Sequence, residues 1–220
     1  MGEHERIKIL ETLEQVYGGY ACGLRYGTPF QLLVATILSA QCTDRQVNKI
    51  TGRLFQHFST PGEFAALTPG ELEPWIRSCG VYRNKARSIV LASRAIMERF
   101  GGQVPDTLED LVSLPGVGRK TANVVLSNAF GVPAIAVDTH VFRISNRLGL
   151  ASANNVLETE RQLMEAISRD KWSAAHHWLI WHGRQVCLAR HPNCSGCPLA
   201  QWCRYARGTD AIDPINPPAG

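Results

Sequence analysis

Four cysteines lie close together near the end of the chain and could bind a metal. Cys187, Cys194, Cys197 and Cys203 form the run C-x6-C-x2-C-x5-C within 17 residues. Thiolates at this spacing suit either tetrahedral zinc or an iron–sulfur cluster. Zinc sites more often contain two C-x2-C pairs and this run contains one, so the spacing leaves both metals open. Disulfides are a more distant alternative, because crowded cysteines in a reducing compartment favour a metal site.

A second candidate for a reactive group is a lysine that follows a glycine-rich turn. In "LPGVGRKTA", a proline, Gly116 and Gly118 precede Lys120. Proline fixes φ and glycine allows positive φ, so the sequence predicts a tight hairpin whose backbone N–H groups all point outward. Those of Gly116, Val117, Gly118 and Arg119 would hold one phosphate at the start of the next helix. The alternative is a corner that merely joins two helices.

Lys120 and Asp138 together suggest a reaction at carbon. A lone lysine is usually a solvated surface residue, but a desolvated lysine near other cations yields a neutral amine that can attack carbon. Asp138 follows the apolar run "AIAV" and is expected to cap the next helix. Its carboxylate could also accept a proton from Lys120 or stabilise a cationic sugar. The capping role and the catalytic role are compatible.

The composition predicts an ordinary globular protein with a basic surface. The 220 residues are 45% hydrophobic and 19% charged, with a formal charge of +4. Residues 182–207 contain four arginines and no acid, and residues 77–99 contain six basic residues and one acid. These two acid-poor stretches suggest basic patches for a polyanion. No apolar run approaches the ~18 residues of a membrane span and the N-terminus does not resemble a signal peptide, so we expect a cytoplasmic protein.

Helical periodicity dominates the chain, so the sequence predicts an all-α fold of about ten helices. Thr28 and Pro29 are expected to begin an almost wholly apolar, central helix. Asp44 is expected to cap the helix after it, and a long amphipathic helix should end at Gly101.

Several motifs in order along the chain resemble the endonuclease III family of DNA base-excision repair glycosylases. They are "LSAQCTD", "LPGVGRKTA", "VDTHVFRISNRLGL", "HHWLIWHGR" and the four-cysteine loop, and the resemblance runs from about Ile7 to Tyr205. It implies an all-α, two-lobed helix–hairpin–helix DNA glycosylase fold. We expect a six-helix lobe over residues 22–132 and a four-helix iron–sulfur lobe over 1–21 and 133–211. Residues 212–220 are expected to be a loose tail.

The resemblance also assigns roles to individual residues. It places the nucleophilic lysine at Lys120, the catalytic aspartate at Asp138 and the residue that fills the gap left by an extruded base at Gln41. Val81 falls where a larger leucine wedge is usual, which predicts a less efficient wedge. Cys42 falls where a small alanine is common, and we expect it simply to be packed. Further DNA contacts are expected from Arg184, Arg190 and His191, and one [4Fe–4S] cluster per chain from Cys187, Cys194, Cys197 and Cys203.

The implied function is a bifunctional DNA glycosylase and abasic-site lyase. It would remove oxidised pyrimidines from double-stranded DNA and cleave the abasic site by β-elimination through a lysine Schiff base. We expect a monomer in the cytoplasm, associated with the nucleoid if the source is bacterial, with no membrane partner. The alternatives are a non-catalytic DNA-binding module, in which Lys120 only contacts phosphate, and a cluster-based redox or sensor protein. Monofunctional relatives that remove adenine carry a different residue at the lysine position.

Overall fold

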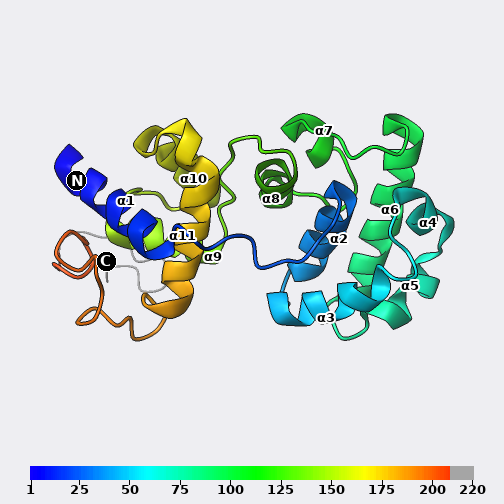
Figure 1. The fold of residues 1–220 in the computed structure, drawn as a ribbon, viewed down its shortest axis with the longest axis horizontal. Helices are drawn as coiled ribbons and strands as arrows, with labels where there is room; N and C mark the ends of the chain where they lie inside the picture. The colour runs from blue at the N-terminus through cyan, green and yellow to red at the C-terminus, as the bar shows by residue number, and fades with distance from the viewer. Residues whose placement is uncertain (209–220) are drawn as a thin grey trace. The chain divides into compact units, whose positions relative to one another are not determined.

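The chain is built from helices and loops. In the computed structural model, residues 1–208 are described, and these contain no β-strand (Figure 1). The predicted all-α class is therefore confirmed, whereas the expected tail at 212–220 lies outside the described residues. Among the described residues, no helix combines the length and apolar character needed to cross a bilayer. The chain divides into two compact units, Cys22–Val132 and Met1–Ala21 with Pro133–Gly220.

The Cys22–Val132 unit contains seven α-helices. They are α2 (Pro29–Ser39), α3 (Asp44–Leu54), α4 (Pro61–Ala66), α5 (Pro69–Ile76), α6 (Tyr82–Phe100), α7 (Leu108–Val112) and α8 (Arg119–Ala129). This is one more than the six-helix lobe that the resemblance implies, and the shortest of the seven, α7, has five residues.

Helix α2 forms the centre of this unit. Eight of its eleven residues are buried, and it packs against α3, α6 and α8. The predicted start is confirmed: Thr28 Oγ1 accepts a hydrogen bond from Gln31 N, and Pro29 occupies the first turn. The long helix α6 packs against α4 and α5 and ends at Gly101, which is left-handed at φ 59°. The unit therefore has one apolar core around α2.

The predicted boundaries of the following helix are wrong by one residue at its start. Thr43, not Asp44, is the N-cap of α3, and its Oγ1 accepts from Gln46 N at 3.3 Å. Asp44 is instead the first helical residue, where its negative charge interacts favourably with the positive end of the helix dipole. A threonine and an aspartate in sequence are both good caps, so composition alone could not choose between them.

The second unit contains α1 (Glu3–Tyr17), α9 (Thr139–Leu148), α10 (Val156–Ala166), the 3₁₀ helix η1 (Arg169–Lys171) and α11 (Trp172–Gln185). Helix α11 packs against α1 and α9 (Figure 1). Ile9, Leu13 and Tyr17 of α1 share one apolar core with Trp178 and Leu179 of α11. Residues 1–21, which contain α1, and the residues after Val132 thus build a single unit, although more than a hundred residues separate them in the chain.

Candidate active site and metal centre

The turn between α7 and α8 is anchored from beneath by apolar side chains. Leu111, Leu114 and Val117 are all buried. The backbone N–H of Val117 donates to Leu114 O at 3.1 Å, and that of Leu114 donates to Leu111 O at 3.1 Å. The expectation that every N–H group of the turn points outward is therefore wrong for Val117, whose N–H closes the turn and whose side chain holds it to the core.

The two glycines of the turn leave backbone donors open. Gly116 is left-handed at φ 76°, and a Cβ there would lie 2.4 Å from the Cβ and Oγ atoms of Ser88. Gly118 is the N-cap of α8 and offers no side-chain cap. Within residues 1–208, the N–H groups of Gly116 and Gly118 find no protein acceptor. Unsatisfied donors at a helix N-terminus form a ready anion site.

Lys120 lies in the first turn of α8 and is exposed, as is Arg119 before it. No carboxylate within the described chain pairs with Lys120. The ammonium group is available beside the open N–H donors. The role of Lys120 as a nucleophile stays a prediction.

Asp138 performs the predicted cap of α9 with one carboxylate oxygen. Its Oδ1 accepts from His140 N at 2.9 Å and from Val141 N at 2.8 Å. Its Oδ2 accepts no hydrogen bond from residues 1–208. The buried run 134–137 leads into Asp138, which is itself partly exposed. The cap thus fixes the carboxylate while one of its oxygens stays available for another partner.

Gln41 and Val81 both adopt a left-handed backbone conformation, at φ 52° and 56°. Both side chains are exposed, and Val81 is 52% exposed. For a β-branched residue this conformation is an outlier, and strained residues persist only where the surroundings over-determine them. The two segments lie together, because a Cβ on Gly80 would come 3.4 Å from Gln41 O. We call residues 40–42 and 79–81 the paired segments.

A buried lysine holds the paired segments. Lys85 is only 6% exposed, and its Nζ donates to Leu38 O at 2.9 Å and to Ala40 O at 2.5 Å. Its own N–H donates to Val81 O at 3.2 Å. A cation at the C-terminal end of α2 also interacts favourably with the helix dipole. Sequence reasoning missed this residue, whose neighbours in the sequence give no sign that it reaches carbonyls more than 40 residues earlier.

Two buried arginines of α9 hold the four-cysteine loop. Arg147 donates from Nη1 to Leu188 O at 2.8 Å and from Nη2 to Ala189 O at 3.0 Å. Its Nη1 also lies 3.6 Å from Cys187 Sγ. Arg143 Nη2 lies 3.0 Å from both Gly183 O and Cys187 O. Both arginines were missed from the sequence, although an acid-free helix carrying arginines among its apolar positions was a usable signal.

The four thiol groups are close enough to influence one another. Burial raises the pKa of Cys203 and of Cys197, and the other cysteines of the loop raise both further. Cys203 Sγ lies 3.3 Å from Arg147 O. His182 connects Cys197 to α1, with Nε2 at 3.7 Å from Cys197 Sγ and Nδ1 at 3.1 Å from Tyr17 Oη. The thiols are thus surrounded by groups that orient sulfur.

The residues present fit an iron–sulfur cluster, because the four thiols share one loop whose cysteines lie near Arg147 and His182. Each thiolate of a four-iron cluster binds a different iron, so its ligands stand further apart than those of one zinc ion. The buried Arg147 guanidinium lies over the ring of Tyr205, 4.6 Å from its centroid, and places a positive charge beside the sulfurs. This charge would offset that of the thiolates.

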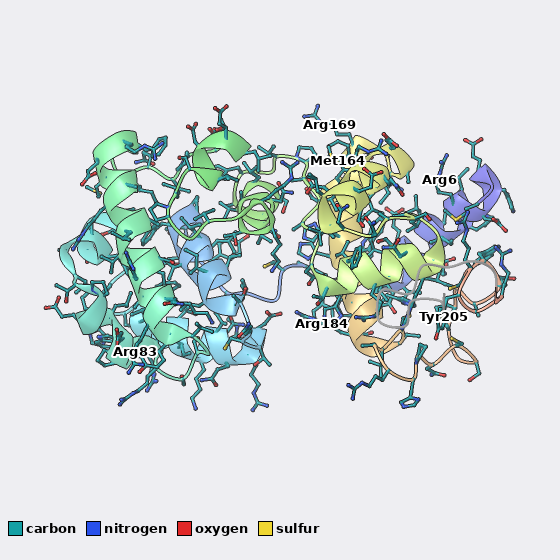
Figure 2. The ribbon with its side chains drawn as sticks, turned by 180° about the vertical axis from the view of Figure 1, so that it is seen from behind. Arg6, Arg83, Met164, Arg169, Arg184 and Tyr205 are labelled. Carbon is teal, nitrogen blue, oxygen red and sulfur yellow. The ribbon has the colours of Figure 1, made fainter. Side chains whose placement is uncertain are left out.

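The remaining predicted DNA contacts lie on the surface of the same unit. Arg184 is exposed on α11 (Figure 2), with its guanidinium 5.4 Å from the ring of Trp181. Arg190 and His191 are exposed in the loop between Cys187 and Cys194, and His191 is left-handed at φ 57°. These three side chains are therefore accessible to a polyanion.

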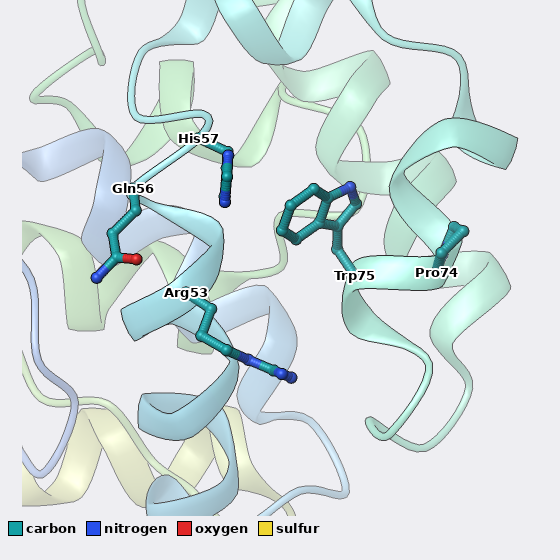
Figure 3. Close-up of a pocket in the computed structure, with 5 residues that line it drawn as sticks. All are labelled: Arg53, Gln56, His57, Pro74 and Trp75. Atoms are coloured by element: carbon teal, nitrogen blue, oxygen red, sulfur yellow. The ribbon is translucent and has the colours of Figure 1, made fainter.

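One pocket of the Cys22–Val132 unit lies apart from every predicted site residue. It has a volume of about 330 Å³ and is lined by Arg53, Gln56, His57, Pro74 and Trp75 (Figure 3). The rings of His57 and Trp75 lie 4.7 Å apart and partly close it. Because none of these residues belongs to the turn or the paired segments, the pocket is not the candidate active site.

The helix–hairpin–helix turn, the capped aspartate and the thiol loop define a class of DNA repair protein. Residues 34–169 match the family of HhH-GPD superfamily base excision DNA repair proteins. Residues 187–203 match the iron-sulfur binding domain of endonuclease III. The second match begins at Cys187 and ends at Cys203, and it confirms the predicted [4Fe–4S] cofactor over zinc.

Known relatives refine this class to one family. Endonuclease III of Bacillus subtilis is 48% identical over 91% of this chain and 92% of its own, and that of Synechocystis is 50% identical over 92% and 93%. The structure of a trapped endonuclease III–DNA covalent intermediate, an estranged-adenine complex, aligns with a TM-score of 0.91 at 46% identity, covering 94% of this chain and 98% of that one. The chain belongs to the endonuclease III family, as the motifs predicted.

Proposed function

We propose that this chain removes oxidised pyrimidines from duplex DNA and then cleaves the abasic site through a Schiff base on Lys120. One observation carries the proposal: the exposed amine of Lys120 lies in the first turn of α8, beside backbone donors that have no acceptor within residues 1–208. A phosphate bound by Gly116 and Gly118 N–H would bring the sugar of a neighbouring nucleotide to this amine. The likeness to a relative trapped as a covalent DNA intermediate supports this arrangement.

The proposed chemistry uses the same amine twice. The lone pair of Lys120 Nζ attacks C1′, the bond from C1′ to the base breaks, and the base leaves with a proton. The sugar ring then opens to a Schiff base, which acidifies the protons at C2′. Loss of one C2′ proton breaks the C3′–O bond, and the strand is cut on the 3′ side of the lesion. Because Lys120 is exposed in the free protein, its amine is accessible to the sugar of bound DNA.

Asp138 would supply the negative charge that this reaction needs. Because Oδ1 is held by the N–H groups of His140 and Val141, the carboxylate cannot rotate freely. Oδ2 would then accept the proton from Lys120 or stabilise the positive charge that develops on the sugar. A cap that is already formed before DNA binds costs no ordering in the transition state.

Gln41 would fill the gap left by the extruded base, and Val81 would act as the wedge in the duplex. A base inside a duplex hides C1′, and rotating it out costs a few kcal/mol. The exposed side chains of Gln41 and Val81 are suited to entering the duplex, because the hydrogen bonds of Lys85 already hold the segments that carry them. The smaller side chain of Val81, compared with the leucine usual in the family, predicts a weaker wedge.

The four cysteines would hold the cluster, which supplies rigidity rather than a reactive site. With four thiolate ligands it has no open position for substrate. Cys187 and Cys194 bound at either end would fix the loop that carries Arg190 and His191. Those two residues and Arg184 would contact phosphates, which position DNA without reading its sequence.

Borohydride trapping tests the proposal directly. The holoenzyme is mixed with duplexes that carry thymine glycol, 5-hydroxycytosine, uracil, 8-oxoguanine or an abasic site, and a covalent adduct is sought on a denaturing gel. We expect adducts with the oxidised pyrimidines and the abasic site, loss of the adduct in Lys120→Gln, and normal trapping in Lys49→Gln. Lys49 is a matched control, since it is an exposed lysine of the same unit. DNA binding without any adduct would favour the non-catalytic module instead.

A further inference from the structure

Two cysteines outside the metal centre lie within contact distance of each other in the paired segments. The Sγ atoms of Cys42 and Cys79 are 3.6 Å apart. Cys42 directly follows the left-handed Gln41, and Cys79 lies two residues before the left-handed Val81. The expectation that Cys42 is simply packed is therefore incomplete, because its thiol faces a second thiol.

We propose that Cys42 and Cys79 form a redox-sensitive pair, which hydrogen peroxide converts to a disulfide that joins the segment of Gln41 to that of Val81. The disulfide itself does not depend on the proposed function, whereas its effect on the reaction does. A disulfide has an S–S distance of about 2.05 Å, so the two sulfurs must approach by only about 1.5 Å.

The surroundings keep the two sulfurs together. Lys85 holds Ala40 and Val81 through hydrogen bonds, and the backbone of Gly80 lies against Gln41 O. A third tie comes from Gln46, whose Nε2 lies 2.8 Å from Ser78 Oγ. These contacts join the two segments on both sides of the thiols, so the pair does not need a rare opening of the fold in order to meet.

The two thiols differ in a way that suits stepwise oxidation. Cys42 is partly exposed, so peroxide can reach it, whereas Cys79 is 1% exposed. Burial, followed by the hydrogen bond that Cys79 donates to Cys42, raises the pKa of Cys79 to about 11, and the nearby Lys85 ammonium opposes that rise. Cys42 is therefore the expected site of attack, with Cys79 as the resolving thiol.

The reaction balances with peroxide as the only co-reactant. The Cys42 thiol attacks one oxygen of hydrogen peroxide, which breaks the O–O bond and leaves a sulfenic acid and one water. The Cys79 sulfur then attacks the Cys42 sulfur, the S–O bond breaks, and the hydroxyl group leaves with the Cys79 proton as a second water. Two thiols are oxidised and one peroxide is reduced to two waters. A thiol reductant reverses the change.

The disulfide would alter the presentation of Gln41 and Val81. Drawing the two sulfurs together moves the backbone on both sides. Gln41, next to Cys42, and Val81, two residues after Cys79, would then shift from their positions in the reduced protein. Misplacement of about 1 Å can reduce an enzymatic rate by about 100-fold. We therefore expect the oxidised form to process a lesion in duplex DNA at least about tenfold more slowly, with no change in its cluster.

The test oxidises the reduced holoenzyme with increasing hydrogen peroxide, blocks free thiols with N-ethylmaleimide and maps peptides without reduction. We expect a Cys42–Cys79 cross-linked peptide that disappears after dithiothreitol. Cys42→Ala should abolish it, whereas Cys22→Ala, which removes the third thiol of the same unit, should not. Two results would overturn the proposed disulfide. One is oxidation of Cys42 to a sulfinic acid without a cross-link, and the other is alkylation of both Cys42 and Cys79 at peroxide concentrations that already bleach the cluster.

The expected effect of the disulfide on the cleavage rate is tested with the same samples. The cleavage rate on a duplex with an abasic site is measured before oxidation, after it, and after reduction, while the visible absorbance reports the cluster. We expect a reversible loss in the wild type and none in Cys42→Ala. A cross-linked enzyme with full activity would refute the effect on the segments, and an unoxidised enzyme with no activity would instead refute the proposed function.

Discussion

The guanidinium of Arg147 donates a 2.8 Å hydrogen bond to the backbone carbonyl of Leu188 and so ties helix α9 to the four-cysteine loop. The same helix begins at the cap formed by Asp138. One helix therefore carries a proposed catalytic carboxylate at its start and the support of the metal centre near its end. Loss of the loop should consequently disturb the position of Asp138 through α9 itself.

Replacing Arg147 with methionine should destabilise the loop. The change removes two hydrogen bonds from a charged donor and leaves the carbonyls of Leu188 and Ala189 without that donor. Such losses cost about 2–4 kcal/mol in free energy of unfolding. We expect a lower Tm and faster bleaching of the cluster absorbance by a chelator. Arg190→Ala, an exposed arginine of the same loop, is the control, and equal behaviour of both variants would contradict the supporting role.

Asp138→Asn should keep the fold and lose catalysis. The amide oxygen can still accept the hydrogen bonds of His140 N and Val141 N, while the amide nitrogen replaces the available Oδ2. The charge that would assist Lys120 is then absent, and we expect at least about a 100-fold fall in single-turnover rate. Thermal unfolding and single-turnover cleavage are measured together. If the rate falls only as far as the folded fraction falls, the cap is the whole role of this residue.

Gly116→Ala should damage the turn for two separable reasons. A left-handed alanine costs about 1–2 kcal/mol, and its Cβ would overlap Ser88. The double variant Gly116→Ala with Ser88→Gly removes the overlap but keeps the unfavourable φ, so it should recover part of the lost stability. Urea unfolding of the four proteins in this cycle measures the coupling. Strict additivity of the two changes would show that Ser88 does not confine the turn.

The sequence predicts well those features that depend on neighbours in the chain. Thr28 and Asp138 were found as caps because a capping side chain bonds to backbone two or three residues ahead. The Pro-Gly turn was found because Gly116 permits a positive φ. The four-cysteine loop was found by spacing alone, although spacing did not distinguish iron–sulfur from zinc.

Features that depend on distant contacts were not predictable in this way. Lys85 reads as a surface lysine in a basic helix, and only the folded chain brings it to Leu38 and Ala40. A β-branched residue argues against a left-handed backbone, so the conformation of Val81 contradicts its local preference.

Arg190→Ala should weaken DNA binding without regard to sequence or damage. Arg190 is exposed between two cluster ligands, where the thiolate bonds would hold its backbone still. Loss of one phosphate contact should reduce the slope of log K against log salt by about one unit. Titrations of damaged and undamaged duplex at several salt concentrations measure this slope, with unchanged cluster absorbance as the control. An unchanged slope would mean that the loop serves only as a scaffold.

Lys85→Met should separate the positioning of the paired segments from the stability of the unit. Methionine has a similar length and removes a buried charge, so relief of desolvation offsets part of the two lost hydrogen bonds. We expect the free energy of unfolding to change by less than about 2 kcal/mol. Without the ties to Ala40, the left-handed Gln41 and Val81 should relax, and cleavage of a duplex lesion should fall at least about tenfold. Cleavage of an abasic site in single-stranded DNA, which has no stack to enter, should stay within about twofold. Equal losses on both substrates would show that Lys85 supports the fold in general and does not position these two residues.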